Sequence, residues 1–314
     1  MALGDRPLHF GVQLQAQRCS WAEWAAAVQA VEGLGYGSVW TFDHLLPFAG
    51  ADDGACFETL TTLSAMALIT SRARIGVLVN GVLYRDPAVL AKAAAQVDEM
   101  SRGRLEFSLG AAWAEREFNA YGIDFPPLAE RYARLDEALE LIKLLWSQHR
   151  TTFRGQYYQS HDAPCEPKPV QSPHPPITIG GTGAGSLRIA AKHADRLNMV
   201  GSPEDCSRWS QKLQQLCEEL GRDAREVELS VHPTVAIGRD RPEAEALAAS
   251  MAAGYGTDVG SELDRWIVGT PDEVKDQLQR YLDVGISHFV FAVGHPFDVE
   301  PLRLLQTEVL AHLD

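Results

Sequence analysis

Two neighbouring polar residues, Asp43 and His44, directly follow a short β-rich run at residues 38–42. A neutral imidazole at the end of a strand could hydrogen-bond a ring carbonyl or exchange a proton with a substrate. No H-E-x-x-H pattern or comparable set of ligands accompanies His44, so no metal site is expected. A single histidine at a strand end can also be purely structural, and this alternative stays open.

A glycine-rich turn runs from Gly180 through Gly181, Thr182 and Gly183 to Gly185, between a β-rich run and a helical segment. Backbone N–H groups in such a turn could converge on a phosphate, helped by the helix N-terminus. The turn lacks the dinucleotide fingerprint, because Ser186 stands where the third glycine is needed. It also lacks the Gly-Lys-Ser/Thr of a Walker loop. The alternative is a flexible loop whose glycines permit close backbone packing.

Short β-rich runs alternate with amphipathic helices along the whole sequence. The clearest helix spans about 129–147, where one apolar stripe contains Leu135, Ala138, Leu139, Ile142, Leu145 and Trp146. Eight strands are expected, at 9–15, 38–42, 75–79, 105–109, 177–179, 196–199, 227–236 and 288–293. Strands that alternate with helices imply a parallel sheet, and eight such units predict a closed (β/α)8 TIM barrel of the α/β class.

No change of composition marks a domain boundary, so residues 1–314 are expected to form a single domain. Two segments interrupt the alternation, at about 148–176 and 238–266. The first contains six prolines, at 164, 167, 169, 173, 175 and 176. Both are interpreted as insertions, the first as an irregular segment or hairpin over one end of the barrel, and the second with a helix at 242–253.

In such barrels the active site forms at the C-terminal ends of the strands. This rule selects Asp43 and His44, then residues 79–81, 110–117, 180–185 and 200–202. Trp113 and Phe48 could wall an aromatic pocket or belong to the core. Glu115 and Glu117 are interpreted as acids in the first turn of a helix, where the helix dipole favours them.

The chain has 314 residues and a formal net charge of −14. This acidic balance argues against nucleic acid or an anionic membrane as the main partner. No apolar window is long enough to span a membrane, and the N-terminus has no secretory signal pattern. Five scattered cysteines without a C-x-x-C pair indicate small apolar residues in a reducing compartment. A cytoplasmic protein acting on a small molecule is expected.

Several collinear motifs resemble the bacterial luciferase-like flavin superfamily over nearly the whole chain. They are residues 38–44, 84–88, 98–106, 110–113 with Glu117, 121–122, 125–127, 130–131, 179–181, 194–195 and 268–274. Within that superfamily the sequence is most similar to the branch that uses coenzyme F420, a 5-deazaflavin, in place of FMN.

The resemblance implies roles for particular residues of this chain. Asp43 and His44 would face the deazaflavin ring, and Asn80, Gly110 and Ala111 would line its edge. Gly180, Gly181, Thr182 and Gly183 would hold the phosphate. The branch also carries a bulge after the third strand with a non-prolyl cis peptide, which would fall at Leu78–Val79 and support the ring.

The resemblance has two departures, because Trp113 stands where sugar-phosphate dehydrogenases of this branch carry a catalytic glutamate and Phe48 where they carry a tryptophan. Their substrate and their acid–base assignment are therefore not carried over to this chain. The predicted function is hydride transfer between F420 and a small organic substrate, with His44, Asp43 and Trp113 as catalytic residues. The alternatives are an FMN-dependent monooxygenase that uses oxygen and a flavin-binding protein without turnover. A homodimer is also expected from the resemblance.

Overall fold

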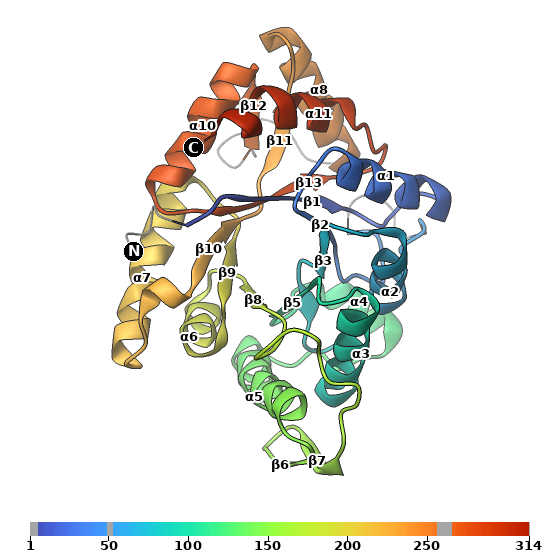
Figure 1. Ribbon diagram of the computed structural model, residues 1–314, viewed down its shortest axis with the longest axis vertical. Coiled ribbons are helices and arrows are strands. Elements are labelled where there is room, and N and C mark those ends of the chain that lie inside the picture. The colour runs from blue at the N-terminus through green and yellow to red at the C-terminus, as the bar shows by residue number, and fades with distance from the viewer. Residues whose placement is uncertain (1–5, 49–52, 256–265, 314) are drawn as a thin grey trace.

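A computed structural model describes residues 6–48, 53–255 and 266–313. Its centre is a ring of parallel strands surrounded by helices, seen along its shortest axis in Figure 1. The eight strands of the ring are β1 (His9–Leu14), β2 (Ser38–Thr41), β3 (Arg74–Val77), β5 (Leu105–Gly110), β8 (Ile177–Gly180), β9 (Arg196–Met199), β10 (Glu228–Val231) and β13 (His288–Val293). The predicted (β/α)8 barrel is confirmed.

Pairing between the first and last strands closes the barrel. β1 is parallel to β13 from His9 opposite His288 to Leu14 opposite Val293. β13 also pairs with β10, so no edge remains between the two ends of the ring. The strands are short and almost entirely buried, which explains why they lack the regular alternation of apolar and polar residues that a half-exposed strand shows.

The helices begin where the sequence provides caps. Ser20, Ser202 and Thr270 each form a capping box with an acidic residue three positions later. The helices are α1 (Trp21–Gly33), α2 (Thr59–Ile69), α3 (Pro87–Met100), α4 (Glu115–Tyr121), α5 (Leu128–Ser147), α6 (Ala184–His193), α7 (Pro203–Glu219), α8 (Arg241–Tyr255), α10 (Pro271–Asp283) and α11 (Glu300–Glu308). Within the described residues, short 3-10 helices also lie at Ala224–Glu226 and Leu310–His312.

The chain bulges after β3, as the family resemblance implies. The peptide bond between Leu78 and Val79 is cis, at the predicted position. The amide of Gln13 donates a hydrogen bond to the carbonyl of Leu78 over 2.9 Å. After the bulge, the two-residue strand β4 (Asn80–Gly81) continues the pairing with β5.

The prediction of one strand at 227–236 is wrong, because the structure has two separate strands in this segment. β10 ends at Val231, and after His232 and Pro233 the chain forms β11 (Thr234–Ile237). Proline has no N–H to donate to a neighbouring strand, which makes Pro233 a natural break. β11 pairs with β13 only through Thr234 and then with β12 (Trp266–Gly269), a strand that the sequence interpretation missed.

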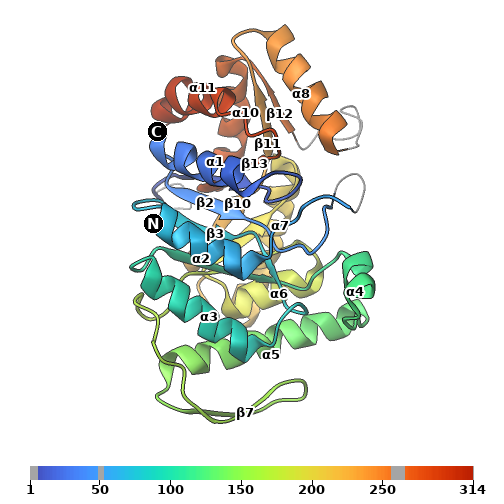
Figure 2. The same cartoon turned by 90° about the vertical axis from the view of Figure 1, so that its right-hand side faces the viewer.

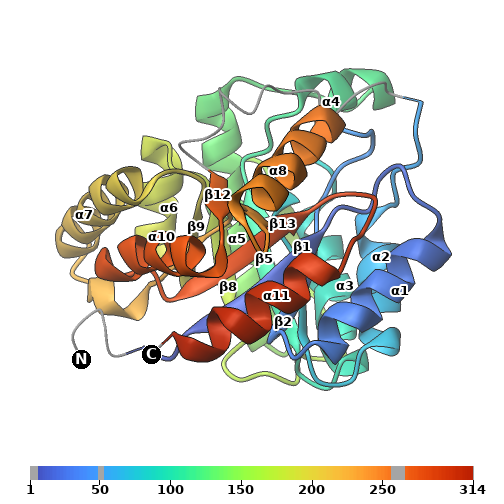
Figure 3. The ribbon, with the colours of Figure 1, turned by 90° about the horizontal axis from the view of Figure 1, so that it is seen from above.

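The two segments expected as insertions lie at opposite ends of the molecule. The first contains an antiparallel hairpin of β6 (Thr151–Arg154) and β7 (Gln159–Ala163), which projects from the barrel on the side away from α8 (Figures 1 and 2). The described part of the second contains α8, which packs on β11 and β12. Seen from above, α8 lies over the strands while α1, α2 and α3 flank them (Figure 3). The single-domain interpretation stays a prediction.

Candidate active site

A cavity of about 550 Å³ lies at the C-terminal ends of the strands. Every residue expected at the site lines it: Asp43, His44, Leu78, Val79, Asn80, Gly110, Ala111, Trp113, Gly180, Gly181, Thr182 and Gly183. These residues follow β2, β3, β5 and β8, which meet at one rim because the strands are parallel. The barrel therefore brings together residues that are distant in sequence.

Asp43 is a buried carboxylate with strong partners. Its oxygens accept two hydrogen bonds from Nη1 of Arg85, at 2.8 and 3.0 Å, and one from the backbone N–H of Gly81 at 2.9 Å. Arg85 also pairs with Glu58, the N-cap of α2. Asp43 thereby fixes the chain after the bulge to the end of β2, and its negative charge is balanced by Arg85.

His44 is held by a carboxylate from another part of the chain. Its Nδ1 lies 2.7 Å from Oε1 of Glu117, on α4. Glu117 is fully buried and also accepts hydrogen bonds from the N–H of Leu45 and the hydroxyl of Tyr84, both at 2.8 Å. Burial opposes ionisation of Glu117, but these hydrogen bonds and the attraction of His44 outweigh it and lower the pKa of the carboxyl.

The electrostatics of this pair assign the imidazole tautomer. Because an ionised Glu117 only accepts, Nδ1 of His44 carries the proton that it donates, and Nε2 is the nitrogen left for a ligand. Burial and the hydrogen bond to Glu117 raise the pKa of Tyr84, so its hydroxyl stays protonated and remains a donor. Glu117 is thus a positioning residue for His44, contrary to its interpretation as an ordinary acid of a helical first turn.

Aromatic side chains surround the other side of His44. The indole of Trp113 meets the imidazole edge to face, with ring centroids 5.4 Å apart. Phe48 lies 5.5 Å from the same ring, and Phe42 packs against both. Trp113 is nevertheless 68% exposed, so it belongs to the wall of the cavity and not to the core.

Three polar atoms at the cavity have no hydrogen-bond partner among the described residues. They are Oδ1 of Asn80, Nε2 of His232 and Nε of Arg131, all buried atoms of residues that line the cavity. An unpaired buried polar group is costly, and such groups are rare unless something else satisfies them. These atoms therefore indicate a polar ligand in this cavity.

The glycine-rich turn satisfies both interpretations of its sequence. Gly181 has a left-handed φ of 111°, and a Cβ on Gly180 would meet the side chain of Val79 at 2.8 Å. A Cβ on Gly185 would meet the ring of Tyr132 at 2.3 Å, so close packing does require glycine here. The turn also leads into α6, whose N-terminus has no side-chain cap and no acidic residue in its first turn. Its N–H groups remain free for an anion.

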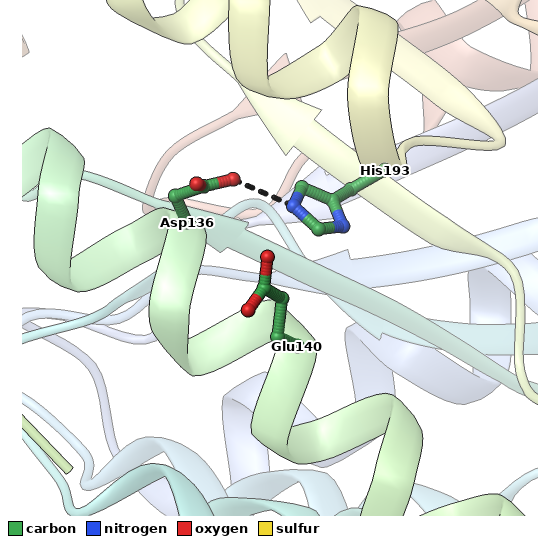
Figure 4. Close-up of side chains that lie close together, drawn as sticks. All are labelled: Asp136, Glu140 and His193. Carbon is green, nitrogen blue, oxygen red and sulfur yellow. Dashed lines mark hydrogen bonds and ion pairs between the residues drawn. The ribbon is translucent and has the colours of Figure 1, made fainter. Parts of the chain in front are cut away.

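One group of side chains in the described residues has the composition of a metal site. Asp136 and Glu140 on α5 face His193 on α6, as Figure 4 shows. The ammonium of Lys192 lies 2.9 Å from Asp136 and 2.6 Å from Glu140, and Nε2 of His193 lies 2.6 Å from Asp136. Lys192 already pairs with both carboxylates and occupies the position between them, so we interpret the group as an ion-pair cluster that joins α5 to α6.

The sequence interpretation missed three residues that line the cavity, Arg131, Tyr132 and His232. Arg131 and Tyr132 arrive from the first turn of α5, and His232 arrives from the break after β10. His232 directly follows a strand, and the rule that selected Asp43 would have found it if the strand at 227–236 had been ended earlier. Nothing in the sequence marks Glu117 as buried.

The fold and the cavity define a (β/α)8 barrel with partnerless polar atoms at its mouth, beside an oriented histidine. The sequence profile of the luciferase-like monooxygenase family matches residues 7–265. The chain belongs to this family, as the motifs predicted. Among the described residues, none of the helices has the length and apolar character needed to cross a membrane.

The sequence similarity to curated relatives extends over nearly the whole chain. The protein is 31% identical to the F420-dependent glucose-6-phosphate dehydrogenase of Kineococcus radiotolerans, with 91% of each chain covered. It is also 31% identical to the enzyme of the same name from Nakamurella multipartita, with 92% of each chain covered.

Solved structures of the same fold include an F420-dependent secondary alcohol dehydrogenase in complex with an F420–acetone adduct. That structure has a TM-score of 0.85 and 19% identity, covering 98% of this chain and 100% of the other. The F420-dependent tetrahydromethanopterin reductase of Methanopyrus kandleri has a TM-score of 0.82 and 20% identity, covering 98% of this chain and 100% of the other. At these identities the likeness concerns the fold.

Proposed function

We propose that this protein is an F420-dependent oxidoreductase that transfers a hydride between the deazaflavin and a small organic substrate. The observation that carries the proposal is the single cavity where Asp43, His44, Asn80, Trp113 and the glycine turn meet. Both curated relatives described above are named as F420-dependent dehydrogenases, and the similarity covers nearly the whole of each chain. This supports the choice of cofactor.

The residues present fit a deazaflavin with a phosphate-bearing side chain. The partnerless Oδ1 of Asn80 and Nε2 of His232 are suited to the polar edge of a ring. The uncapped N-terminus of α6 and the guanidinium of Arg131 are suited to an anionic tail. Nη1 of Arg131 donates to the carbonyls of Ala111 and Ala112, which fixes the guanidinium at the rim.

When bound, the deazaflavin supplies the hydride chemistry at its C5 atom. The chain supplies the proton transfer and the geometry. Glu117 holds Nδ1 of His44 protonated, so Nε2 is the atom that accepts a proton from an alcohol or returns it to a carbonyl oxygen. Asp43 holds the bulge through Gly81, and Trp113 forms the exposed wall of the cavity. An indole N–H can donate a hydrogen bond but does not ionise, so Trp113 acts through contact with the substrate and not as an acid or base.

The experiment that tests the proposal compares the two cofactors on the purified protein. Oxidised F420 and FMN are titrated separately while cofactor fluorescence is followed, and oxygen uptake is measured with each reduced cofactor. We expect F420 to bind and to exchange hydride with a carbonyl compound or alcohol. Binding of FMN alone, with oxygen consumption in the presence of reduced FMN, would overturn the proposal in favour of a monooxygenase. Tight F420 binding with no hydride transfer would indicate a carrier.

The homodimer and the cytoplasmic location expected from the sequence stay predictions. Light scattering of the purified protein, with and without F420, measures the oligomeric state directly. A monomer in both samples would contradict the first of these predictions.

A further inference from the structure

The rim of the active-site cavity carries an unusual concentration of exposed apolar side chains. Trp113 is 68% exposed, Val200 51% and Leu128 47%, and all three line the cavity. They come from three separate segments, after β5, after β9 and at the start of α5. Exposed large apolar residues that gather around one opening mark a surface that binds an apolar molecule.

The surroundings of His44 also disfavour the binding of a negatively charged substrate group. Two carboxylates lie close to His44: Glu117 is hydrogen-bonded to its imidazole, and Asp43 is the preceding residue in the chain. Arg85 balances Asp43, whereas Glu117 has only neutral donors when His44 is neutral. Burial first, and then repulsion from Glu117 and Asp43, raise the pKa of the neighbouring Cys56 thiol to about 12. The two carboxylates therefore disfavour a further negative charge in this region.

Cations that could hold an anionic substrate are scarce among the described residues of this cavity. Arg131 lines it, but its Nη1 donates to the carbonyls of Ala111 and Ala112, and its guanidinium is the group proposed above to hold the anionic tail of the cofactor. Arg85 is not among the lining residues and is committed to Asp43 and Glu58. A substrate phosphate would therefore find no further cation among the described lining residues to replace its hydration.

Resting on the proposed function, we propose that the substrate is an uncharged ketone or secondary alcohol whose apolar body packs on Trp113 at the rim formed with Val200 and Leu128. The specificity would follow from two differences in free energy. An apolar body is removed from water against the indole, while a charged group would lose its hydration next to Glu117. A sugar phosphate fails on both counts.

The chemical step balances with the groups named. In the direction of oxidation, the carbinol C–H bond would break, and the bound deazaflavin would take up its hydrogen together with both electrons. The hydroxyl O–H bond breaks and its proton goes to Nε2 of His44, while the second C–O bond of the ketone forms. In the direction of reduction, the carbonyl carbon gains the hydride and the carbonyl oxygen gains the proton from the imidazolium.

The test compares an uncharged with an anionic substrate in each direction. The two ketones differ by a single carboxylate, whereas glucose 6-phosphate also differs from cyclohexanol in size and in its hydroxyl groups. Reduced F420 is mixed with the protein and either cyclohexanone or 4-oxocyclohexanecarboxylate, and the return of deazaflavin absorbance is followed. In the reverse direction, oxidised F420 is supplied with cyclohexanol or glucose 6-phosphate. We expect the uncharged member of each pair to have a kcat/KM at least about tenfold higher, because desolvating an unpaired charge costs more than a tenfold preference.

The role of the rim is tested with Trp113→Ala and Trp113→Phe. We expect Trp113→Ala to raise the KM for cyclohexanone about tenfold through loss of aromatic contact area, and Trp113→Phe to recover most of that loss. The dissociation constant of F420 should change less than about threefold, since the indole packs on the substrate side. Val89→Ala is the matched control, because Val89 is 61% exposed on α3 and does not line the cavity.

The outcomes separate this proposal from the one on which it rests. Absence of F420 binding would overturn both. F420 binding with equal or faster turnover of the charged compounds, with no turnover of any of the four compounds, or with an unchanged KM in Trp113→Ala would overturn the substrate class alone.

Discussion

The two ends of the barrel use buried polar residues in opposite ways. At the N-terminal ends of the strands, Arg196 lies 2.7 Å from both Glu106 and Glu228, and Glu106 also pairs with Arg74. Glu228 accepts further hydrogen bonds from His9 and Ser287. At the C-terminal ends, Asn80, His232 and Arg131 each keep a buried atom without a partner in the described part of the chain.

The difference teaches which end serves stability and which serves a ligand. Both ends are buried and polar, so neither polarity nor burial distinguishes them. A network whose charges are fully paired has no donor or acceptor left for another molecule. Unpaired buried donors and acceptors destabilise the free protein, and a ligand that pairs with them removes this cost. Substitutions at the floor should therefore change the free energy of unfolding, and substitutions at the mouth should change binding or turnover.

The largest effect is expected for Arg196→Met at the floor. This change leaves Glu106 and Glu228 buried without their shared cation, and removing one partner of a buried ion pair typically costs about 3–5 kcal/mol. Urea unfolding followed by circular dichroism measures the loss. Arg150→Met is the control, because Arg150 belongs to an exposed pair with Asp162 and its loss should cost less than about 1 kcal/mol. A weakened F420 affinity without a loss of stability would remove the distinction between the two ends.

The next largest effect is expected for His44→Ala at the mouth. Loss of the proton acceptor should lower the rate of hydride transfer at least about 100-fold, equivalent to about 3 kcal/mol, while the F420 dissociation constant changes only a few-fold. Stopped-flow absorbance separates the two quantities. His161→Ala, at an exposed position on β7, should leave both unchanged. An unaltered rate in His44→Ala would exclude His44 from the mechanism.

A third effect concerns the acid sensitivity of folding at His232. Burial lowers the pKa of this imidazole to about 4, so between pH 6.5 and 4 the unfolded chain binds a proton that the folded protein does not. The free energy of unfolding should fall as the pH falls through this window, by about 2 kcal/mol more than in His232→Gln. Unfolding midpoints across the window measure the difference, with His149→Gln at an exposed position as the control. Parallel pH profiles of the wild type and His232→Gln would contradict the assignment.

The smallest effect is expected for Asn80→Ala. The change removes the partnerless Oδ1 together with the hydrogen bond from Nδ2 to the carbonyl of Ser108. F420 affinity should fall about tenfold, because one ligand hydrogen bond is worth roughly 1–1.5 kcal/mol. Fluorescence titration measures it, and Asn119→Ala on the exposed face of α4 should bind normally. An equal loss in both variants would show that Oδ1 does not contact the cofactor.

The sequence predicted the elements well where one local rule dominated. The helix expected at about 129–147 is found at Leu128–Ser147, and the strands at Arg196–Met199 and His288–Val293 have the expected bounds, because apolar periodicity acts over a few residues. The prediction failed at 227–236, where Pro233 interrupts an otherwise continuous β-rich run, and β12 was missed beyond it. A run of strand-forming residues does not record where the chain leaves the barrel.

The sequence by itself determined the repeating units, their closure into a barrel and the strand ends at which polar residues would gather. It could not determine which of two acids in one helical turn faces inward. His44 and Glu117 are 73 positions apart, and only the packing of α4 against the end of β2 makes them neighbours. Local free energies fix helices and strands, but the partners of a buried charge, and the atoms left without any, depend on contacts between distant segments that exist only once the barrel has closed.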